Sequence, residues 1–228
     1  MPAFDLERAA RFIYHSNLME FEDSRLAPPL DEIRRQLAAN PRPLHGHAGS
    51  LCDVMELAAD KMTLHRGDLR QWQRQVVREH IALEAGVKPE ESLPPELAAK
   101  VGWERDGNLS QGKIGVDHAQ IDVLLERFIQ AHRKFLSEEA WSAPDVIDFA
   151  ADSHRVFERI HPFWDGNGRI GRLAVNYILA FYGLPIAVFP SDERDSLYVP
   201  AVTAADDGPM RAYLRRCLPE GVAAVGFP

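Results

Sequence analysis

One twelve-residue stretch, 161–172, constrains this chain more than any other part of the sequence. It reads His-Pro-Phe-Trp-Asp-Gly-Asn-Gly-Arg-Ile-Gly-Arg and lies between two segments with apolar residues at helical spacing. Pro162 disfavours helical backbone at His161, so the preceding helix is predicted to end there. Gly166 and Gly168 allow a tight turn and the close approach of a ligand to the backbone. The sequence therefore predicts two helices joined by a short, ligand-accessible turn.

The residues of this turn favour a phosphate site. Apolar residues follow the turn at spacings of three and four, which indicates a buried helix face. They are Ile170, Leu173, Ala174, Tyr177, Ile178 and Phe181. The start of that helix directs backbone N–H groups and the positive end of its dipole at one point. Arg169 and Arg172 add two permanent positive charges. Asp165 fits beside an anion if it holds Mg²⁺, whose coordination the phosphates and water would complete. We expect a site for Mg²⁺ and a polyphosphate with His161 beside it.

The same stretch resembles the signature of the Fic family, His-Pro-Phe-x-(Asp/Glu)-Gly-Asn-(Gly/Lys)-Arg-x-x-Arg, at every specified position. The resemblance implies an all-α fold, a Fic-type helical bundle with a small β-hairpin flap before the signature loop. It also implies an enzyme, a protein adenylyltransferase that uses Mg²⁺ and ATP to transfer AMP to a Ser, Thr or Tyr hydroxyl of a target protein. Relatives that transfer phosphate tend to have Lys at the position of Gly168, so glycine there favours nucleotidyl transfer.

The resemblance gives each residue of the signature a role. It implies that His161 is the general base that takes the proton of the target hydroxyl, as a side chain that titrates near neutral pH can do. It implies that Asp165 is the Mg²⁺ ligand. It further implies that the phosphates are held by the backbone of the turn, by the Asn167 side chain and by two guanidinium groups. The residues are Gly166, Asn167, Gly168, Arg169 and Arg172.

A second resemblance lies near the N-terminus. The segment Ser16–Phe21 resembles the family's inhibitory pattern, (Ser/Thr)-x-x-x-Glu-(Gly/Asn), through the glutamate and departs from it at Phe21. A helix predicted over about 5–21 places Ser16 and Glu20 on one face. The resemblance implies that these two residues inhibit the enzyme in cis. If this helix packs against the signature helix, Glu20 can reach Arg172 and occupy the place of a γ-phosphate oxygen. The departure at Phe21 leaves the strength of this inhibition open.

The remainder of the chain suggests how the site is framed. Residues 1–100 form an N-terminal helical region and 101–218 form the Fic core, expected to fold as one compact unit. Glycines punctuate the interval 101–117, and extended pieces around Trp103–Arg105 and 113–116 predict a hairpin. In the family this flap holds the target segment as an added strand. The residues expected to dock the target are Lys113, Ile114, Gly115 and Val116.

Capping signals predict where several helices begin. Asp5 is suited to cap the first helix. Ser142 and Asp145 form a capping box at the start of the helix that leads to His161. Ser50 and Asp53 suggest a further helix beginning near residue 51.

Charge and cysteine content limit the function classes. The net charge of −8 argues against a nucleic-acid binder. No segment reaches the roughly 18 apolar residues of a membrane span. Cys52 and Cys217 cannot form a disulfide framework and lack metal-binding spacing, so we expect a reduced, cytoplasmic setting. The expected partners are ATP and a protein substrate with an exposed Ser, Thr or Tyr, with homodimer formation left open.

Alternatives remain at this stage. A catalytically idle module could use the same pocket to sense ATP, although such a module has no use for His161. Within the enzyme class, the transferred group could be UMP, phosphate or phosphocholine, or the reaction could remove AMP. Relatives often have an Asn near the position of Ala205, after a Tyr corresponding to Tyr198, that contacts adenine. Ala205 does not supply that contact, so the identity of the base is open.

Overall fold

The computed structural model describes residues 5–39, 45–87, 91–110, 114–138 and 141–222. Regular structure in this part of the chain is helical, apart from one isolated antiparallel bridge between Glu104 and Phe163. The all-α prediction is therefore confirmed. The longer helices are α1 (Leu6–Leu18), α2 (Leu30–Ala38), α3 (Gly46–Ala59), α4 (Arg66–Ala85), α6 (Ile121–Leu136), α7 (Ala143–Ile160), α8 (Asn167–Phe181) and α10 (Gly208–Arg216). The shorter ones are η1 (Ser24–Leu26), α5 (Pro95–Ala98), η2 (His118–Gln120), η3 (Ser191–Glu193), η4 (Arg194–Tyr198) and α9 (Val199–Thr203).

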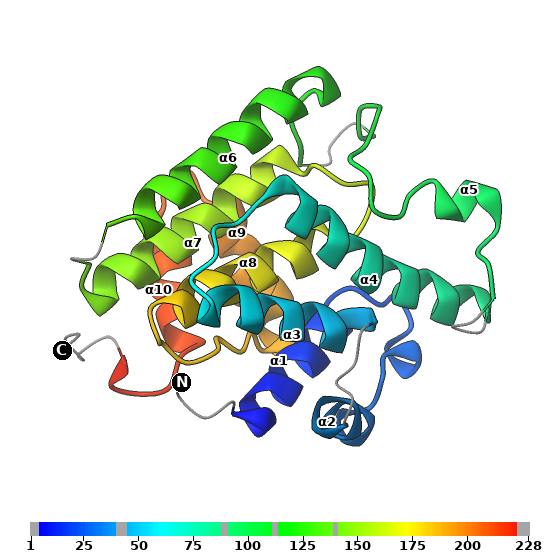
Figure 1. Cartoon of the computed structure of the whole chain (residues 1–228), viewed down its shortest axis with the longest axis horizontal. Helices are drawn as coiled ribbons and strands as arrows, with labels where there is room; N and C mark the ends of the chain where they lie inside the picture. The colour runs from blue at the N-terminus through cyan, green and yellow to red at the C-terminus, as the bar shows by residue number, and fades with distance from the viewer. Residues whose placement is uncertain (1–4, 40–44, 88–90, 111–113, 139–140, 223–228) are drawn as a thin grey trace.

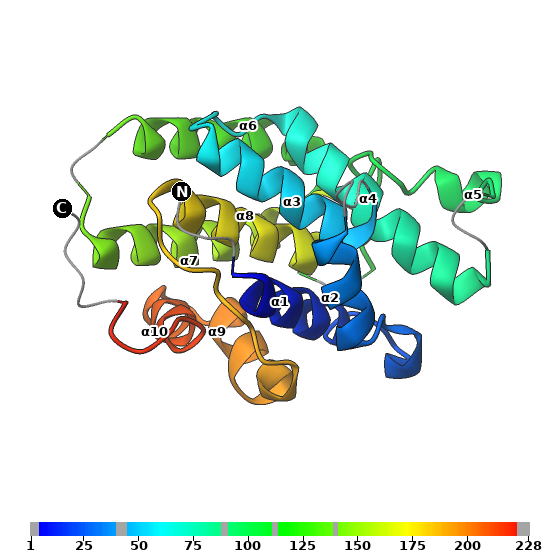
Figure 2. The ribbon, with the colours of Figure 1, turned by 60° about the horizontal axis from the view of Figure 1, so that its bottom comes forward.

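Helix α8, the helix after the signature turn, runs through the middle of the molecule (Figures 1 and 2). It contacts α7, α3, α4 and α1, and all its residues except Gly168 and Ala180 are buried. A helix enclosed on most sides is largely apolar, and the buried polar residues of α8 all make hydrogen bonds, namely Asn167, Arg169, Arg172 and Asn176. This burial fixes the position of the α8 N-terminus, and with it the site.

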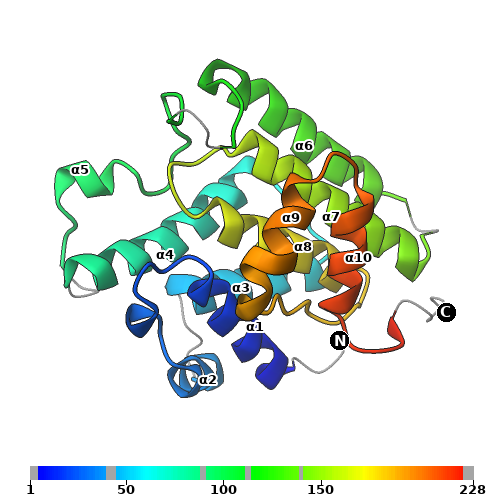
Figure 3. The same ribbon diagram turned by 180° about the vertical axis from the view of Figure 1, so that it is seen from behind.

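Helix α7 supplies the other arm of the signature turn. It begins as predicted, with the Ser142 amide donating to Asp145 Oδ2 at 3.0 Å and the Asp145 amide donating to Ser142 Oγ at 3.4 Å. It ends at Ile160, and His161 follows in the left-handed conformation with φ 48° and ψ 61°. Helices α9 and α10 cover α7 on the side seen in Figure 3.

The N-terminal helix α1 packs on α2, α3 and α8 (Figure 2). Asp5 caps it as predicted, because its carboxylate accepts a hydrogen bond from the Arg8 amide at 2.9 Å. The helix ends at Leu18, before the predicted end at residue 21. The amides of Glu20 and Phe21 both donate to the Asn17 carbonyl, at 2.9 and 3.1 Å, so Glu20 lies in the turn after the helix.

The hairpin predicted within 101–117 does not form a strand ladder among the described residues. Glu104 forms an antiparallel bridge with Phe163 of the signature loop instead. The guanidinium group of the next residue, Arg105, donates hydrogen bonds to three backbone carbonyls. That group donates to the carbonyls of His161 at 2.8 Å and Gly107 at 2.7 Å, and also to that of Val116. One buried arginine thus joins the signature loop to the interval 101–117. Lys113, expected in the second strand, lies outside the described residues.

Helix α3 begins at Gly46, not near residue 51. Ser50 is therefore inside the helix, where its hydroxyl is buried and donates to Gln75 Oε1 of α4 at 2.6 Å. Cys52 and Cys217 do not form a disulfide bond with each other. Within the described ranges, no helix combines the length and the apolar character that crossing a membrane requires.

Candidate active site

The signature turn is held in shape by its own side chains. Phe163 is fully buried, and Asn167 makes two hydrogen bonds to its backbone. Asn167 Oδ1 accepts from the Phe163 amide at 2.9 Å, and Asn167 Nδ2 donates to the Phe163 carbonyl at 2.8 Å. The Asn167 side chain thus holds the loop in shape, and its predicted contact with phosphate stays a prediction. Its backbone amide remains part of the site.

The N-terminus of α8 forms an anion-binding face. The first hydrogen bond within this helix runs from the Ile170 amide to the Gly166 carbonyl, at 2.9 Å. The amides of the residues before Ile170 are those that a helix start leaves without helical partners. Gly166 adopts φ 82°, and a Cβ at this position would lie 2.7 Å from Val77 Cγ2. Glycine is therefore required there for both conformation and space.

These amides face a cavity of about 430 Å³. His161 and Asp165 stand at its edge together with residues from the turn after α1, from η4 and from α9. The cavity is lined by Glu20, Ile114, Glu158, His161, Trp164, Asp165, Gly166, Asn167, Gly168, Arg194, Tyr198, Val199, Val202 and Thr203. The structure thus brings together most of the residues that the sequence singled out, and neither signature arginine is among the described lining residues.

Arg172 is fully buried and engaged by the N-terminal segment. Its Nε donates to Ser16 Oγ at 3.0 Å, and its Nη2 donates to the Ser16 carbonyl at 3.1 Å and to Glu20 Oε1 at 2.7 Å. Its Nη1 donates to the Tyr198 hydroxyl at 3.1 Å. Burial disfavours the charged form of Arg172 and by itself would lower its pKa. The neighbouring Tyr198 and Glu20 outweigh this effect and raise the pKa of Arg172 above its ordinary value. A nucleotide phosphate reaching Arg172 would therefore have to displace Glu20.

Glu20 covers the start of α8. A Cβ at Gly168 would lie 2.4 Å from Glu20 Oε1 and 3.0 Å from Arg172 Nη1, so glycine permits this close approach. Burial alone would raise the pKa of Glu20, but the charges of Arg172 and Arg169 outweigh it and hold the pKa below its usual value. The carboxylate is therefore ionised at neutral pH and occupies the place suited to an anion.

Phe21 fixes the turn that carries Glu20. Its side chain is 6% exposed, and its ring packs on the ring of His80 with centroids 4.3 Å apart. His80 Nδ1 in turn accepts a hydrogen bond from Arg169 Nη1 at 3.0 Å. Burial and the charge of Arg169 lower the pKa of His80, so its ring stays neutral and can accept this bond. The residue that departs from the inhibitory pattern is thus an anchor of the segment.

Asp165 and Arg169 form the remaining polar edge of the site. Arg169 is buried, and its Nη2 lies 3.4 Å from Asp165 Oδ1. The Asp165 side chain is 39% exposed and lines the cavity. A single partly exposed carboxylate suits Mg²⁺ bound mainly by phosphates and water, and the donor set fits that ion. The described residues contain no cluster of three or more His, Cys, Asp or Glu that could hold a metal unaided.

His161 has a carboxylate neighbour, Glu158, that was not predicted from the sequence. Glu158 lies one turn earlier on α7, and its Oε2 is 3.9 Å from His161 Nδ1. Burial and the charge of Glu20 raise the pKa of Glu158 to about 7. A glutamate three residues before the signature histidine, on the same helix face, was the available signal.

Of the expected flap residues, Ile114, Gly115 and Val116 fall in the described chain. Ile114 is 44% exposed and lines the cavity. A Cβ at Gly115 would lie 3.3 Å from His161 Cβ, so this backbone passes directly beside the histidine. The segment is placed where an extended target could reach His161, and its docking role stays a prediction.

The wall opposite the signature turn comes from η4 and α9. Tyr198, 7% exposed, uses its hydroxyl to contact Arg172 Nη1 at 3.1 Å and His154 Nε2 at 2.9 Å. Ala205 is exposed and is not among the described lining residues. Arg194, at the start of η4, also lines the cavity and was not singled out from the sequence.

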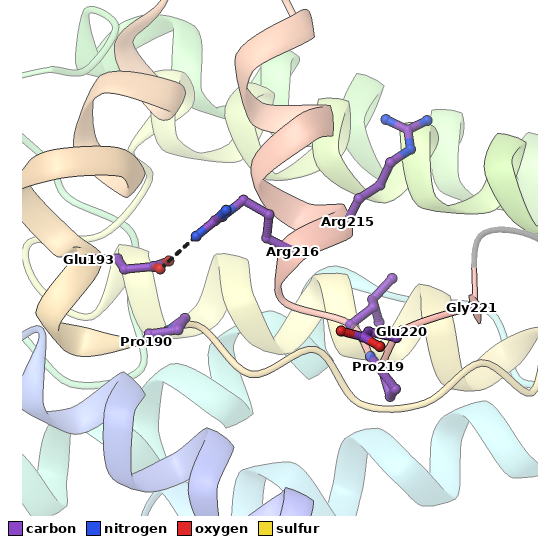
Figure 4. A pocket seen from close by; sticks show the side chains of 8 residues that line it. Pro190, Glu193, Arg215, Arg216, Pro219, Glu220 and Gly221 are labelled. Carbon is purple, nitrogen blue, oxygen red and sulfur yellow. Dashed lines mark hydrogen bonds and ion pairs between the residues drawn. The ribbon is translucent and has the colours of Figure 1, made fainter.

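A second hollow of about 380 Å³ lies at the C-terminal end of α10 (Figure 4). An ion pair joins Arg216 to Glu193 at 3.0 Å across it and ties α10 to η3. It contains none of the signature residues. The cavity at the start of α8 is lined by residues of the signature, so we take it as the candidate active site.

Comparison with known proteins identifies a family and relatives that this chain resembles. Residues 63–179, slightly more than half of the chain, match the model of the Fic/DOC family. The protein adenylyltransferase Fic of Drosophila melanogaster is 33% identical over 104 residues, which cover 46% of this chain and 20% of that protein. Its counterpart in Drosophila ananassae is 32% identical over the same share. The match thus spans about a fifth of the length of these curated relatives.

Solved structures share the fold. A Fic-domain signalling protein from Bacteroides thetaiotaomicron has a TM-score of 0.67 at 20% identity, covering 93% of this chain and 84% of that one. The structure of IbpAFic2 covalently tethered to Cdc42 has a TM-score of 0.55 at 16% identity, covering 93% of this chain and 62% of that one.

Proposed function

The chain belongs to the Fic/DOC family, and from that premise we propose that it transfers AMP from ATP to a hydroxyl group of a target protein. The observation that carries the proposal is that one cavity joins His161, Asp165 and the amide-bearing start of α8. A base, a carboxylate and an anion site around one space match the needs of nucleotidyl transfer. IbpAFic2, a solved structure with the same fold, is covalently tethered to the protein Cdc42, which supports a protein substrate for this chain.

His161 starts the proposed reaction. Its imidazole takes the proton from the target hydroxyl while the hydroxyl oxygen attacks the α-phosphorus of ATP. The bond from that phosphorus to the bridging oxygen breaks, and pyrophosphate leaves with the electron pair. AMP remains on the target as a phosphodiester. The left-handed backbone of His161, fixed between Ile160 and Pro162, sets the ring at the cavity edge.

The α8 N-terminus stabilises the negative charge that develops on the phosphate oxygens. The amides of the turn are fixed before the reaction, so no reorganisation is needed when charge builds. Arg172 is positioned beneath them for the terminal phosphates once Glu20 has moved. Bound Mg²⁺, held by Asp165, would neutralise phosphate charge and orient the leaving group.

Glu20 restrains this reaction. Its carboxylate and a terminal phosphate compete for the same guanidinium, with the present pair at 2.7 Å. ATP bound beside Glu20 would have its phosphates displaced from in-line geometry, and a misplacement of about 1 Å can cost on the order of 10²-fold in rate. Ser16, which contacts the same arginine, holds the segment in register.

The experiment that tests the function uses Glu20→Gly protein and two forms of labelled ATP. Label in the α-phosphate should appear on protein, whereas label in the γ-phosphate should not. Labelled UTP, CTP and GTP in parallel reactions establish base preference, and Glu20→Gly/His161→Ala protein is the matched control. Mass spectrometry then identifies the modified hydroxyl.

Transfer of γ-label would instead assign phosphate transfer. Binding of ATP without any transfer from α- or γ-labelled forms, with the folded variant and candidate targets present, would support an ATP-sensing module and refute the proposal.

A further inference from the structure

Glu158 is a buried carboxylate to which the proposed reaction gives no task. It is 9% exposed and sits on α7, one turn before His161. Its Oε1 atom is buried and has no hydrogen-bond partner among the described residues. A carboxylate oxygen that is buried without a hydrogen-bond partner destabilises the folded protein. Such a group is expected at a functional site more than in a structural core.

The fold directs this carboxylate at the site. Both Glu158 and His161 line the cavity that holds the α8 N-terminus. Glu158 Oε2 is 3.9 Å from His161 Nδ1, the ring nitrogen on the side of α7. Helix α8 faces the carboxylate with a glycine, since a Cβ at Gly171 would lie 3.3 Å from Glu158 Oε1. The small residue leaves the carboxylate room beside the histidine.

We propose, resting on the function proposed above, that Glu158 is a positioning residue that orients the His161 ring and stabilises its protonated form. A carboxylate beside Nδ1 favours the tautomer with the proton on Nδ1, which leaves Nε2 to take the proton of the target hydroxyl. After that transfer the ring is an imidazolium, and a carboxylate at about 4 Å stabilises its charge. Glu158 itself neither touches the substrate nor exchanges a proton in this role.

The same carboxylate connects the base to the inhibitory segment. Glu20 lies close enough to raise the pKa of Glu158, together with burial, and Arg172 opposes that rise. Removing the Glu20 charge should therefore leave Glu158 more fully ionised and better able to support His161. The charged and titratable groups around the pair are Glu20 from the turn after α1, Arg105 from the loop before α6, His154 from α7, Arg172 from α8 and Tyr198 from η4.

The test is a histidine titration by NMR in the Glu20→Gly background, where Glu158 has lost the repulsion of Glu20. The His161 resonance is assigned by its disappearance in His161→Ala protein. Glu158→Gln should lower the pKa of His161 by about 1 pH unit, because an opposite charge at this range typically shifts a pKa by that amount. Glu158→Asp should retain part of the effect, and Glu126→Gln, on the exposed face of α6, should have none.

An activity measurement completes the test. Glu158→Gln should shift the acidic limb of the pH–rate profile by the same amount as the His161 titration, with ATP affinity unchanged. An unchanged His161 pKa in folded Glu158→Gln protein would overturn the proposal, as would loss of transfer with an unmoved pH profile. The titration needs no turnover. If Glu158→Gln shifts the pKa of His161 in a protein that transfers nothing, the proposed function is refuted and the positioning role of Glu158 is supported.

Discussion

Glu20 Oε1 and Arg172 Nη2 are 2.7 Å apart although 152 residues separate them in sequence. The pair joins the turn after the first helix to the buried helix that carries the signature. The Arg172 side chain has no exposed surface, whereas the Glu20 side chain is 25% exposed. A partly desolvated, charge-assisted pair of this kind is stronger than a surface ion pair. Because Arg172 is fixed in the buried helix, Glu20 is the partner that can move away from the pair.

Glu20→Gly should raise AMP transfer by about 10- to 100-fold over wild type, because the phosphates can then take in-line geometry. The measurement is the initial rate of label incorporation from α-labelled ATP, with thermal unfolding as a check on the fold. Glu22→Gly, in the exposed chain two residues on, is the matched control. Equal rates for wild type and Glu20→Gly would mean that the pair does not restrain catalysis.

His161→Ala should keep ATP binding and lose transfer by about 10²–10⁴-fold, the usual effect of removing a general base. Binding should survive because the α8 amides and Arg172 are untouched. Calorimetry for binding and the label assay for transfer separate the two effects, both in the Glu20→Gly background. Undiminished transfer would exclude His161 as the base.

Asp165→Ala should weaken Mg²⁺-dependent ATP binding and abolish transfer. The control is Asp152→Ala, which removes the same charge from α7, where Asp152 pairs with Arg211 at 2.5 Å far from the signature turn. The readout is ATP affinity with and without added Mg²⁺. If the two variants behave alike, the carboxylate that holds the metal has been assigned wrongly.

Phe21→Ala should loosen the turn that carries Glu20, because it removes the ring packed on His80. We expect transfer to rise above wild type, by less than in Glu20→Gly, and the free energy of unfolding to fall by about 3–5 kcal/mol. Phe21→Leu, which keeps most of the buried volume, should have the smaller effect on both. Lower transfer in Phe21→Ala than in wild type would contradict the anchoring role.

Glu158 should make stability depend on pH. Its pKa is about 7 in the folded protein against an ordinary value of 4.5, so folding favours its protonated form. This contribution is fully present below pH 4.5 and is lost as the pH rises through 7. Relative to Glu158→Gln, wild type should therefore lose up to about 3 kcal/mol of unfolding free energy across that window.

Urea unfolding of both proteins at a series of pH values checks this prediction. The same comparison in the Glu20→Gly background should show a smaller loss, because part of the rise in the Glu158 pKa comes from Glu20. Parallel stability curves for wild type and Glu158→Gln would refute the raised pKa.

Local sequence signals predicted the frame of the site well. Pro162 ended α7 at Ile160, the capping box at Ser142 began it, and the apolar spacing after Arg169 identified α8. Each of these features depends on residues within one or two turns of each other. Backbone preferences and short-range hydrogen bonds decide them before any tertiary contact forms.

Signals that depend on distant partners were misread. Ser50 looks like an N-cap, but its hydroxyl bonds to Gln75 of a neighbouring helix. The glycine-rich interval before α6 is predicted to form a hairpin, but its described residues show no strand ladder, and Arg105 donates instead to the carbonyls of Gly107 and Val116. A polar side chain has several possible partners, and the sequence does not say which one the fold will bring near.

The sequence by itself therefore determined the helical class, the turn between α7 and α8 and the identity of the residues that meet there. The sequence suggested that Glu20 pairs with a signature arginine, but only the tertiary structure decided that Phe21 anchors Glu20 against His80 and that Glu158 lies beside His161. The reason is that local backbone preferences act over a few residues, whereas burial of charges depends on how whole helices pack. The charge states of Glu20 and Glu158 arise from that packing, because each carboxylate acquires its pKa from neighbours on other helices.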